Sequence, residues 1–271
     1  MMVTNTNLSS LAAQRYTDNA QAAQNKSMTA LSSGKRINSA ADDAAGLAIA
    51  EQFAAQIIGN SQGVRNLNDA VSLSQTADGA LEGISDNTQR IRELAVAAGN
   101  STLSASDRQA MQAEVDQLNQ SSNDIIRNTQ FNGQSVLQGG SFAFQAGANA
   151  GEQINLSTGN LGGNTLASAS GQIDLSSPTA ASNSLLALDQ DIQSLNNERS
   201  NLGAFQSRVE SGISNLRSSV ENQSAARSRI ADTDYAAQSA RLAQNRILTE
   251  AGLAMQTQAN ASSKQVLSLL R

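Results

Sequence analysis

The feature that most constrains this chain is the spacing of its apolar residues, which is typical of long helices. From Phe53 to Ala98 the apolar positions recur at steps of three, four, seven or ten residues, so they share one helix face. A stripe of about 45 residues corresponds to roughly 65–70 Å of helix. Gly99-Asn100 follows it with two residues that tolerate a left-handed backbone and can end a helix. A second seam, from Leu185 to Val220, repeats mostly at three and four residues and predicts another long helix.

A third, shorter stripe completes the pattern. Ser104 and Asp107 have the spacing of a capping box, which marks the start of a helix. The apolar positions that follow step by four, three and seven residues: Met111, Val115, Leu118 and Ile125. Three stripes with short connections predict a mostly α protein, built as a long antiparallel helical bundle or coiled coil.

The region at 131–177 differs in kind and predicts a small β-hairpin at the outer end of the bundle. Segments 141–145 and 153–157 alternate apolar and polar residues around a Gly- and Ala-rich turn. Residues 158–177 are rich in Gly and Ser, and we expect an exposed loop there. Pro178, the only proline, fits the first turn of the next helix, with a preceding serine as N-cap.

Both ends of the chain have a helical pattern, but their apolar residues are sparse. Neither end can bury much apolar area alone, so each needs a partner to become ordered. The most economical partner is the other terminus, together with copies of the same pair in neighbouring subunits. The side chains that we expect to pack in this terminal coiled coil are Leu8, Leu11, Leu31, Leu248, Met255, Val266 and Leu269.

The composition lacks the residues on which most catalytic and metal sites depend. The chain has no His and no Cys, which removes the usual general base, the commonest metal ligand and any thiolate. We therefore expect neither an enzyme nor a cofactor or metal. Asp42-Asp43 could be a metal-binding or acid–base pair, but two carboxylates that stabilise the start of a helix are the simpler expectation.

The charge and hydropathy patterns exclude two classes of partner. The basic residues are too dilute for the dense stripe that nucleic-acid binding needs. No segment approaches the roughly 20 apolar residues of a membrane span. The first ten residues also lack the basic start and apolar stretch of a secretory signal peptide. This leaves a cytoplasmic protein, or one exported by a route that cleaves no signal.

Several segments resemble bacterial flagellin. Residues 31–50 (LSSGKRINSAADDAAGLAIA) are similar to the segment that joins the first terminal helix to the rod in that family. Further similar segments follow in the family's order: 88–95 (TQRIRELA), 128–133 (NTQFNG), 229–235 (RIADTDY) and 266–271 (VLSLLR). The resemblance covers residues 1–160 and 178–271, and these long, ordered matches are far more specific than one short motif.

This resemblance implies a structural subunit that polymerises into the bacterial flagellar filament for swimming motility. It implies an inner terminal coiled-coil domain of residues 1–43 and 228–271. It also implies a rod domain of residues 44–227, with three long helices and a β-hairpin region at 131–177. Because Ile173 leads almost directly to Pro178, the chain resembles a short flagellin without variable outer domains. Export through the flagellar type III system, and a secreted, extracellular location, follow from the same resemblance.

The resemblance also implies partners and surface sites. Besides copies of the chain itself, the partners are the filament cap, the hook-associated proteins and an export chaperone at the C-terminal helix. Arg90, Leu94 and Glu114 fall where subunits meet and where a vertebrate Toll-like receptor reads flagellin. Residues 29–50 resemble a peptide that plant innate immune receptors perceive. Members of the family often carry O-linked glycans, for which our candidates are Ser157, Thr158, Thr165, Ser168 and Ser170.

Two alternative hypotheses remain from the sequence. A hook–filament junction protein shares the terminal helices, although segments 88–95 and 128–133 favour flagellin proper. The signalling hairpin of a chemoreceptor has a similar coiled coil rich in Ala, Ser and Gln. It should also bring a membrane span or a signalling tip, and the sequence shows neither.

Overall fold

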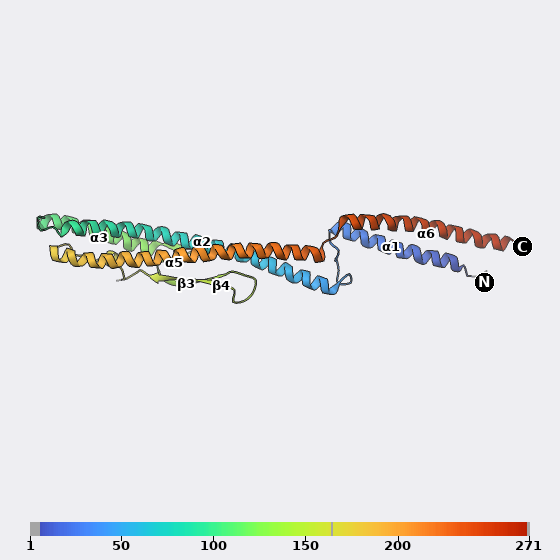
Figure 1. Ribbon diagram of the computed structural model, residues 1–271, viewed down its shortest axis with the longest axis horizontal. Helices are drawn as coiled ribbons and strands as arrows, with labels where there is room; N and C mark the ends of the chain where they lie inside the picture. The colour runs from blue at the N-terminus through green and yellow to red at the C-terminus, as the bar shows by residue number, and fades with distance from the viewer. Residues whose placement is uncertain (1–5, 164, 270–271) are drawn as a thin grey trace. The chain divides into compact units, whose positions relative to one another are not determined.

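The computed structural model describes residues 6–163 and 165–269, with side chains described up to residue 262. The described chain is mostly α-helical (Figure 1), as predicted. Its helices are α1 (Leu8–Ser33), α2 (Ala44–Ala98), α3 (Ala105–Asn128), α4 (Ala167–Ser170), α5 (Pro178–Ala231) and α6 (Tyr235–Leu269). Its strands are β1 (Gln130–Phe131), β2 (Gln134–Ser135), β3 (Gln138–Gln145) and β4 (Gln153–Asn160). None of the described helices combines the length and apolar character needed to cross a membrane.

Contacts divide the chain into two compact units. One contains the residues up to 55 together with those from 221 onward, and the other contains residues 56–220. The division falls inside α2 and α5, so each of these helices contributes to both units. It differs from the predicted boundaries at 43/44 and 227/228, and the domain limits therefore stay a prediction.

The second unit is built on α2, α3 and α5, and its core follows the predicted stripes. Leu81 and Ile84 of α2 and Leu195 and Leu202 of α5 are almost completely buried. Each such side chain contributes about 1.5–3 kcal/mol through its removal from water. Small residues fill the same face of α2 between the larger ones: Ser74, Ala77 and Thr88 are fully buried. The stripes therefore predicted the buried faces of the long helices correctly.

The predicted helix starts are confirmed. The Ser104 side chain accepts a hydrogen bond from the backbone N–H of Asp107, and the Asp107 carboxylate accepts one from the N–H of Ser104. At the start of α5, the Ser177 hydroxyl oxygen accepts from the N–H of Ala180 at 3.1 Å. Pro178 is the first residue of that helix, where its missing N–H costs nothing.

The predicted hairpin is confirmed, but its predicted position at the end of the bundle is wrong. Strands β3 and β4 pair antiparallel, with Ser141 opposite Ser157. They lie alongside α2 and α5, where their inward side chains join the core formed by residues 67–84 and 195–213. The reason is helix length: α3 has 24 residues and α2 has 55. The chain leaves α3 partway along the bundle, and the hairpin covers the helix faces that α3 does not reach.

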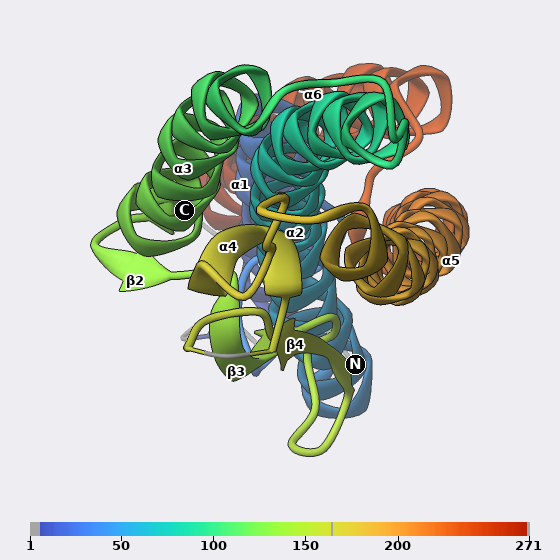
Figure 2. The same cartoon turned by 90° about the vertical axis from the view of Figure 1, so that its left-hand side faces the viewer.

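The expectation of an exposed loop at 158–177 is also wrong. Leu161, Leu166, Ile173 and Leu175 are all buried, and α4 forms within the segment. Figure 2 shows α4 against α2, between α3 and α5. The side chain of Gln112 on α3 holds this segment by accepting from the N–H of Leu175 and donating to the carbonyl of Ile173. The segment is rich in Gly and Ser overall, but its few apolar residues pack into the bundle, which composition alone did not indicate.

Candidate assembly surface

The terminal helices α1 and α6 lie side by side as an antiparallel pair (Figure 1). At one end the Asn7 amide donates to the carbonyl of Ala259, and at the other the Tyr235 hydroxyl donates to the carbonyl of Leu31. The buried residues of α1 are Thr17, Ala20, Ser27 and Ala30. Gly252 of α6 lies opposite Thr17, so close that a Cβ on residue 252 would overlap the Thr17 hydroxyl. Small residues thus allow the two backbones to approach closely.

The larger apolar residues of this pair are outside the seam, contrary to our prediction. Leu8 and Met255 are 63% and 64% exposed, and Leu11 and Leu248 are also exposed. Leu31 is half-buried. The prediction that Leu8, Leu11, Leu248 and Met255 pack in the seam is therefore wrong. Close packing between the two helices selects Ala, Ser, Thr and Gly instead. Val266 and Leu269, the other predicted packing residues, lie outside the described side chains.

A groove of about 700 Å³ runs between α1 and α6 on one face of the pair. Its larger side chains are Tyr16, Leu248 and Met255, and six alanines form much of the remaining wall. The described residues that line it carry no charge. Sequence reasoning missed Tyr16, which is 74% exposed, although its place among alanines spaced by three, four and seven residues is a signal for one helix face. An apolar surface of this kind indicates a site for another protein chain.

The two connections beside this pair are joined by backbone hydrogen bonds. Lys35 and Asp232 form an antiparallel bridge between the loop after α1 and the connection from α5 to α6. The N–H of Arg36 donates to the carbonyl of Ala231 at 2.7 Å, and the N–H of Thr233 donates to that of Gly34 at 3.0 Å. These bonds fix where α1 ends and where α6 begins.

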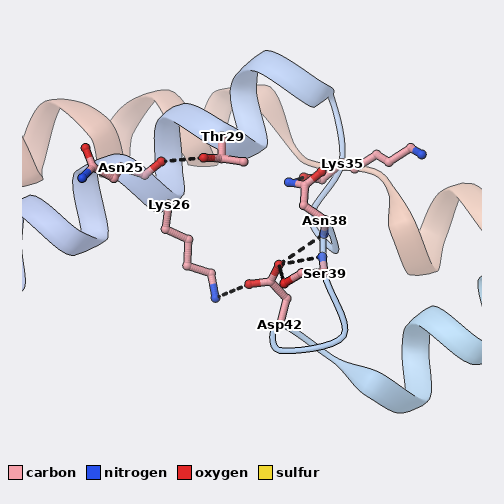
Figure 3. A network of polar contacts seen from close by, with 7 residues as sticks. All are labelled: Asn25, Lys26, Thr29, Lys35, Asn38, Ser39 and Asp42. Carbon is pink, nitrogen blue, oxygen red and sulfur yellow. Dashed lines mark hydrogen bonds and ion pairs between the residues drawn. The ribbon is translucent and has the colours of Figure 1, made fainter.

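Asp42 organises the loop between α1 and α2 (Figure 3). Its carboxylate lies 2.8 Å from the Lys26 ammonium of α1. It also accepts from the backbone N–H groups of Asn38 and Ser39, each at 3.2 Å, and from the Ser39 hydroxyl. The bond from Lys26, followed by that from Asn38, lowers the pKa of Asp42 to about 2. The loop is therefore tied to α1 by a charged side chain.

The paired carboxylates at 42–43 have separate structural roles. Asp43 caps α2 by accepting from the N–H of Gly46 at 2.8 Å, as expected of a carboxylate at a helix start. That expectation is wrong for Asp42, which holds the preceding turn and the Lys26 ammonium instead. Within the described part of the chain, no three acidic residues gather as a metal site would require.

Of the three residues predicted to contact other subunits, Arg90 and Glu114 form a pair on the surface and Leu94 lies in the core. Arg90 lies 2.9 Å from Glu114 across the α2–α3 surface and 3.0 Å from Glu93 on its own helix. The bonds to Glu114 and Glu93 raise the pKa of the Arg90 guanidinium. Leu94 is only 7% exposed and packs in a core cluster that includes Val115. An outward-facing role for the Leu94 side chain is therefore excluded in this fold.

The candidate hydroxyls also divide by exposure. Ser157 on β4 and Thr165 in the following loop are exposed, and Ser170 is half-buried. Thr158 and Ser168 are buried, so the expectation that they lie in an exposed loop is wrong. Thr158 faces inward because side chains alternate along β4, and Ser168 lies inside the bundle, where the Thr88 hydroxyl bonds to it at 3.1 Å.

Comparison with known proteins identifies the family. Residues 4–141 match the family model of the bacterial flagellin N-terminal helical region, and residues 185–270 match that of the C-terminal helical region. The chain belongs to the bacterial flagellin family. Flagellins are structural filament proteins, which confirms the prediction that this one is not an enzyme.

Similar flagellins extend over the whole chain. A flagellin of Halalkalibacterium halodurans is 40% identical over the full length of both chains. The flagellar filament 33 kDa core protein of Treponema phagedenis is 38% identical, also over both full lengths. The crystal structure of Bacillus cereus flagellin is 30% identical with a TM-score of 0.50, and the match covers 56% of this chain and 88% of that one. The full-length matches agree with the prediction of a short flagellin without variable outer domains.

Proposed function

We propose that this flagellin polymerises into the flagellar filament through the outer apolar face of its α1–α6 pair. The single observation that carries the proposal is the exposure of Leu8, Leu11, Leu248 and Met255, of which Leu248 and Met255 line the uncharged groove. A lone helix pair that leaves its largest apolar side chains in water gains little from folding. Covering that face with apolar surface of neighbouring subunits supplies the missing burial.

The partner that we assign to this face is a second copy of the chain. Full-length relatives carry the name of flagellar filament core proteins, and such filaments consist of repeated subunits. A contact between two different patches of the same molecule does not close on itself and extends as an open helix. The groove, which Leu248 and Met255 line, and the exposed Leu8 and Leu11, which are not part of its lining, offer such unlike patches.

Assembly of purified protein tests this proposal. Full-length chain should form filaments when seeded with filament fragments and salt, as seen by electron microscopy. Removal of residues 1–40 and 232–271 should leave a helical monomer that forms none. Leu248→Ser should likewise raise the concentration needed for assembly. Leu186→Ser, a substitution at a leucine of the second unit that is more exposed than Leu248, should leave that concentration unchanged. Normal filaments from the truncated chain would exclude the terminal pair as the assembly surface.

We infer a second, lengthwise contact on the rod at Arg90 and Glu114. Both side chains are half-exposed, and an ion pair so open to solvent contributes little to stability. Arg90→Ala and Glu114→Ala should therefore shorten filaments and reduce swimming without changing the melting temperature of the monomer. The same variants should bind a vertebrate Toll-like receptor more weakly. Unchanged swimming and unchanged receptor binding in both variants would remove these residues from either surface.

The remaining partners are proposed from family membership. They comprise the filament cap, the hook-associated proteins, the export chaperone at the C-terminal helix and the plant immune receptors. Secretion through the flagellar type III system is proposed on the same ground. Comparing culture medium from cells with and without that export system tests the route, because the chain should reach the medium only in the first case. A hook–filament junction protein would instead appear in a few copies at the filament base.

O-linked glycosylation is proposed for the accessible hydroxyls of the hairpin region, Ser157, Thr165 and Ser170. Their exposure admits a transferase, whereas burial removes Thr158 and Ser168 from the set. The intact mass of filaments sheared from native cells should exceed the 28.1 kDa of the bare chain by whole sugar units. A mass equal to that of the bare chain would overturn the proposal.

A further inference from the structure

Among the described residues that line the groove between α1 and α6, Met255 carries the one sulfur, a thioether that peroxide oxidises. It is 64% exposed and lines the groove on α6, seven residues after Leu248. The other two methionines with described side chains differ in setting. Met28 on α1 is exposed but is not part of the groove lining, and Met111 is half-buried against a core cluster. The three therefore provide an internal comparison of position and access.

We propose that Met255 is an oxidation site at which hydrogen peroxide blocks subunit assembly. The inference rests on the proposed assembly through this face. In the reaction, a sulfur lone pair attacks one peroxide oxygen, so that an S–O bond forms and the O–O bond breaks. The other oxygen leaves as water after proton transfer, the sulfur is oxidised by two electrons, and the peroxide is reduced. The product is methionine sulfoxide, which dedicated reductases convert back to the thioether.

The apolar lining of the groove explains why oxidation of Met255 should weaken assembly. Sulfoxide formation turns a flexible apolar side chain into a polar one. Six alanines and Leu248 make up much of the lining that Met255 shares; its polar side chains are uncharged, so no charge in the described lining favours the S–O dipole. When a second subunit covers the groove, the sulfoxide oxygen must lose its water, which is unfavourable without a new hydrogen bond. The thioether loses no such bond, so the same covering favours the reduced subunit.

The position of Met255 in the groove also determines whether peroxide oxidises the free subunit or the filament faster. In the free subunit, solvent and peroxide reach Met255 directly. In a filament assembled through this face, the neighbouring subunit covers the groove and should slow its oxidation. Oxidation therefore selects unassembled subunits, and filaments formed before exposure stay intact. Reduction by the reductases would return the blocked subunits to the pool that can assemble.

The first test treats full-length monomer with hydrogen peroxide and locates the added oxygen by peptide mass spectrometry. Met255 should be oxidised faster than Met111. The treated chain should need at least about tenfold more protein to assemble, because a polar group is buried without a partner. Treatment with methionine sulfoxide reductases should reverse the effect. Normal assembly of a chain fully oxidised at Met255 would overturn the inference.

Two substitutions locate the effect. Met255→Leu keeps the side chain apolar and removes the sulfur, so this variant should assemble equally before and after peroxide. Met28→Leu is the matched control, and peroxide should block it as it blocks the unaltered chain. Equal loss of assembly in the Met255→Leu variant would place the sensitive group elsewhere and overturn the inference. Failure of the untreated, unaltered chain to assemble would instead overturn the proposed function.

A protection experiment provides a readout independent of assembly yield. Peroxide is added to preformed filaments and to monomers at the same protein concentration, and the sulfoxide at Met255 is followed over time. The rate should be several-fold lower in filaments. Equal rates would mean that no neighbour covers Met255, which would overturn the inference while leaving assembly by another face intact.

Discussion

Gly63 of α2 lies directly against Ala146 in the turn of the β3–β4 hairpin: a Cβ on residue 63 would stand 2.7 Å from the Ala146 carbonyl oxygen. One helical turn earlier, a Cβ on Gly59 would stand 2.5 Å from the Cβ of Ala148. The side chain of Asn66 donates to the carbonyl of Gln145 at 3.0 Å and fixes the same turn. The hairpin is thus fastened to the backbone of α2, at a place that only glycine leaves open.

Replacing Gly63 by alanine should therefore destabilise the second unit. The new methyl group must displace the hairpin backbone, and overpacking of this kind costs about 1–3 kcal/mol. Gly79 of the same helix is the control, because no atom outside its own helix lies within 4 Å of a Cβ there. Gly79→Ala should stabilise the protein by up to about 1 kcal/mol through helix propensity. Urea unfolding of both variants measures the change in the free energy of unfolding, which should be a loss for Gly63→Ala and a gain for Gly79→Ala. A destabilised Gly79 variant would contradict the reasoning.

The contact between Gly252 and Thr17 gives a prediction for the terminal pair. Gly252→Ala should force α1 and α6 apart and weaken assembly, because the Thr17 hydroxyl, bonded to the carbonyl of Ala13 at 2.9 Å, occupies the space. Adding Thr17→Ala removes that hydroxyl and should restore assembly in the double variant. Sedimentation measures the amount of filament that the single and the double variant form. An unrescued double variant would show that the two residues act independently.

How much of the fold could be predicted depended on which force decides each interface. In α2 and α5, burial of large apolar residues dominates, so their spacing correctly indicated the faces around Leu81 and Leu195. In the terminal pair, close backbone approach dominates, and the rule that leucine is buried before alanine fails. The spacing of apolar residues cannot distinguish these two kinds of interface, because the helices of each kind carry alanines and leucines on neighbouring faces.

The candidate rod and hairpin residues show a similar limit. Leu94 follows Ile91 by three residues and precedes Ala98 by four, so periodicity alone would have placed it in the core, where it lies. Its position in the family favoured a surface role, against this local periodicity. Ser168 had no such signal, because the groups that bond to it inside the bundle are distant in the sequence: a carboxylate 23 residues away at its N–H and the Thr88 hydroxyl at its side chain. Contacts of that range are not visible in local composition.

That carboxylate, Asp191 of α5, should be a sensitive point of the second unit. It is buried and accepts from the N–H groups of Ala167 at 3.1 Å and Ser168 at 2.6 Å. Asp191→Ala leaves both donors without this acceptor and should cost at least about 1–3 kcal/mol, whereas Asp191→Asn keeps one oxygen and should cost less. Asp189→Ala is the control, because its exposed ion pair with Arg92 contributes only about 0–1 kcal/mol. Thermal unfolding ranks the three variants, and equal losses at 189 and 191 would contradict the prediction.

Acid should act on the loop between α1 and α2 through Asp42. The bond from Lys26 and the N–H of Asn38 hold its pKa at about 2, below the ordinary value of 3.8. Because the folded pKa is the lower one, the carboxylate contributes its full stabilisation above pH 3.8 and loses it as the pH falls through about 2. An NMR titration of the Asp42 carboxyl carbon should therefore have its midpoint near 2.

Two lysine substitutions test the cause of this shift. Lys26→Gln removes the ammonium that contacts Asp42, so the midpoint should move up toward the ordinary value. Lys35→Gln is the control, because in Figure 3 the Lys35 side chain points away from Asp42; it should leave the midpoint unchanged. If Asp42 titrated near its ordinary value in the unaltered chain, or if Lys26→Gln had no effect, the network that ties this loop to α1 would not exist in solution.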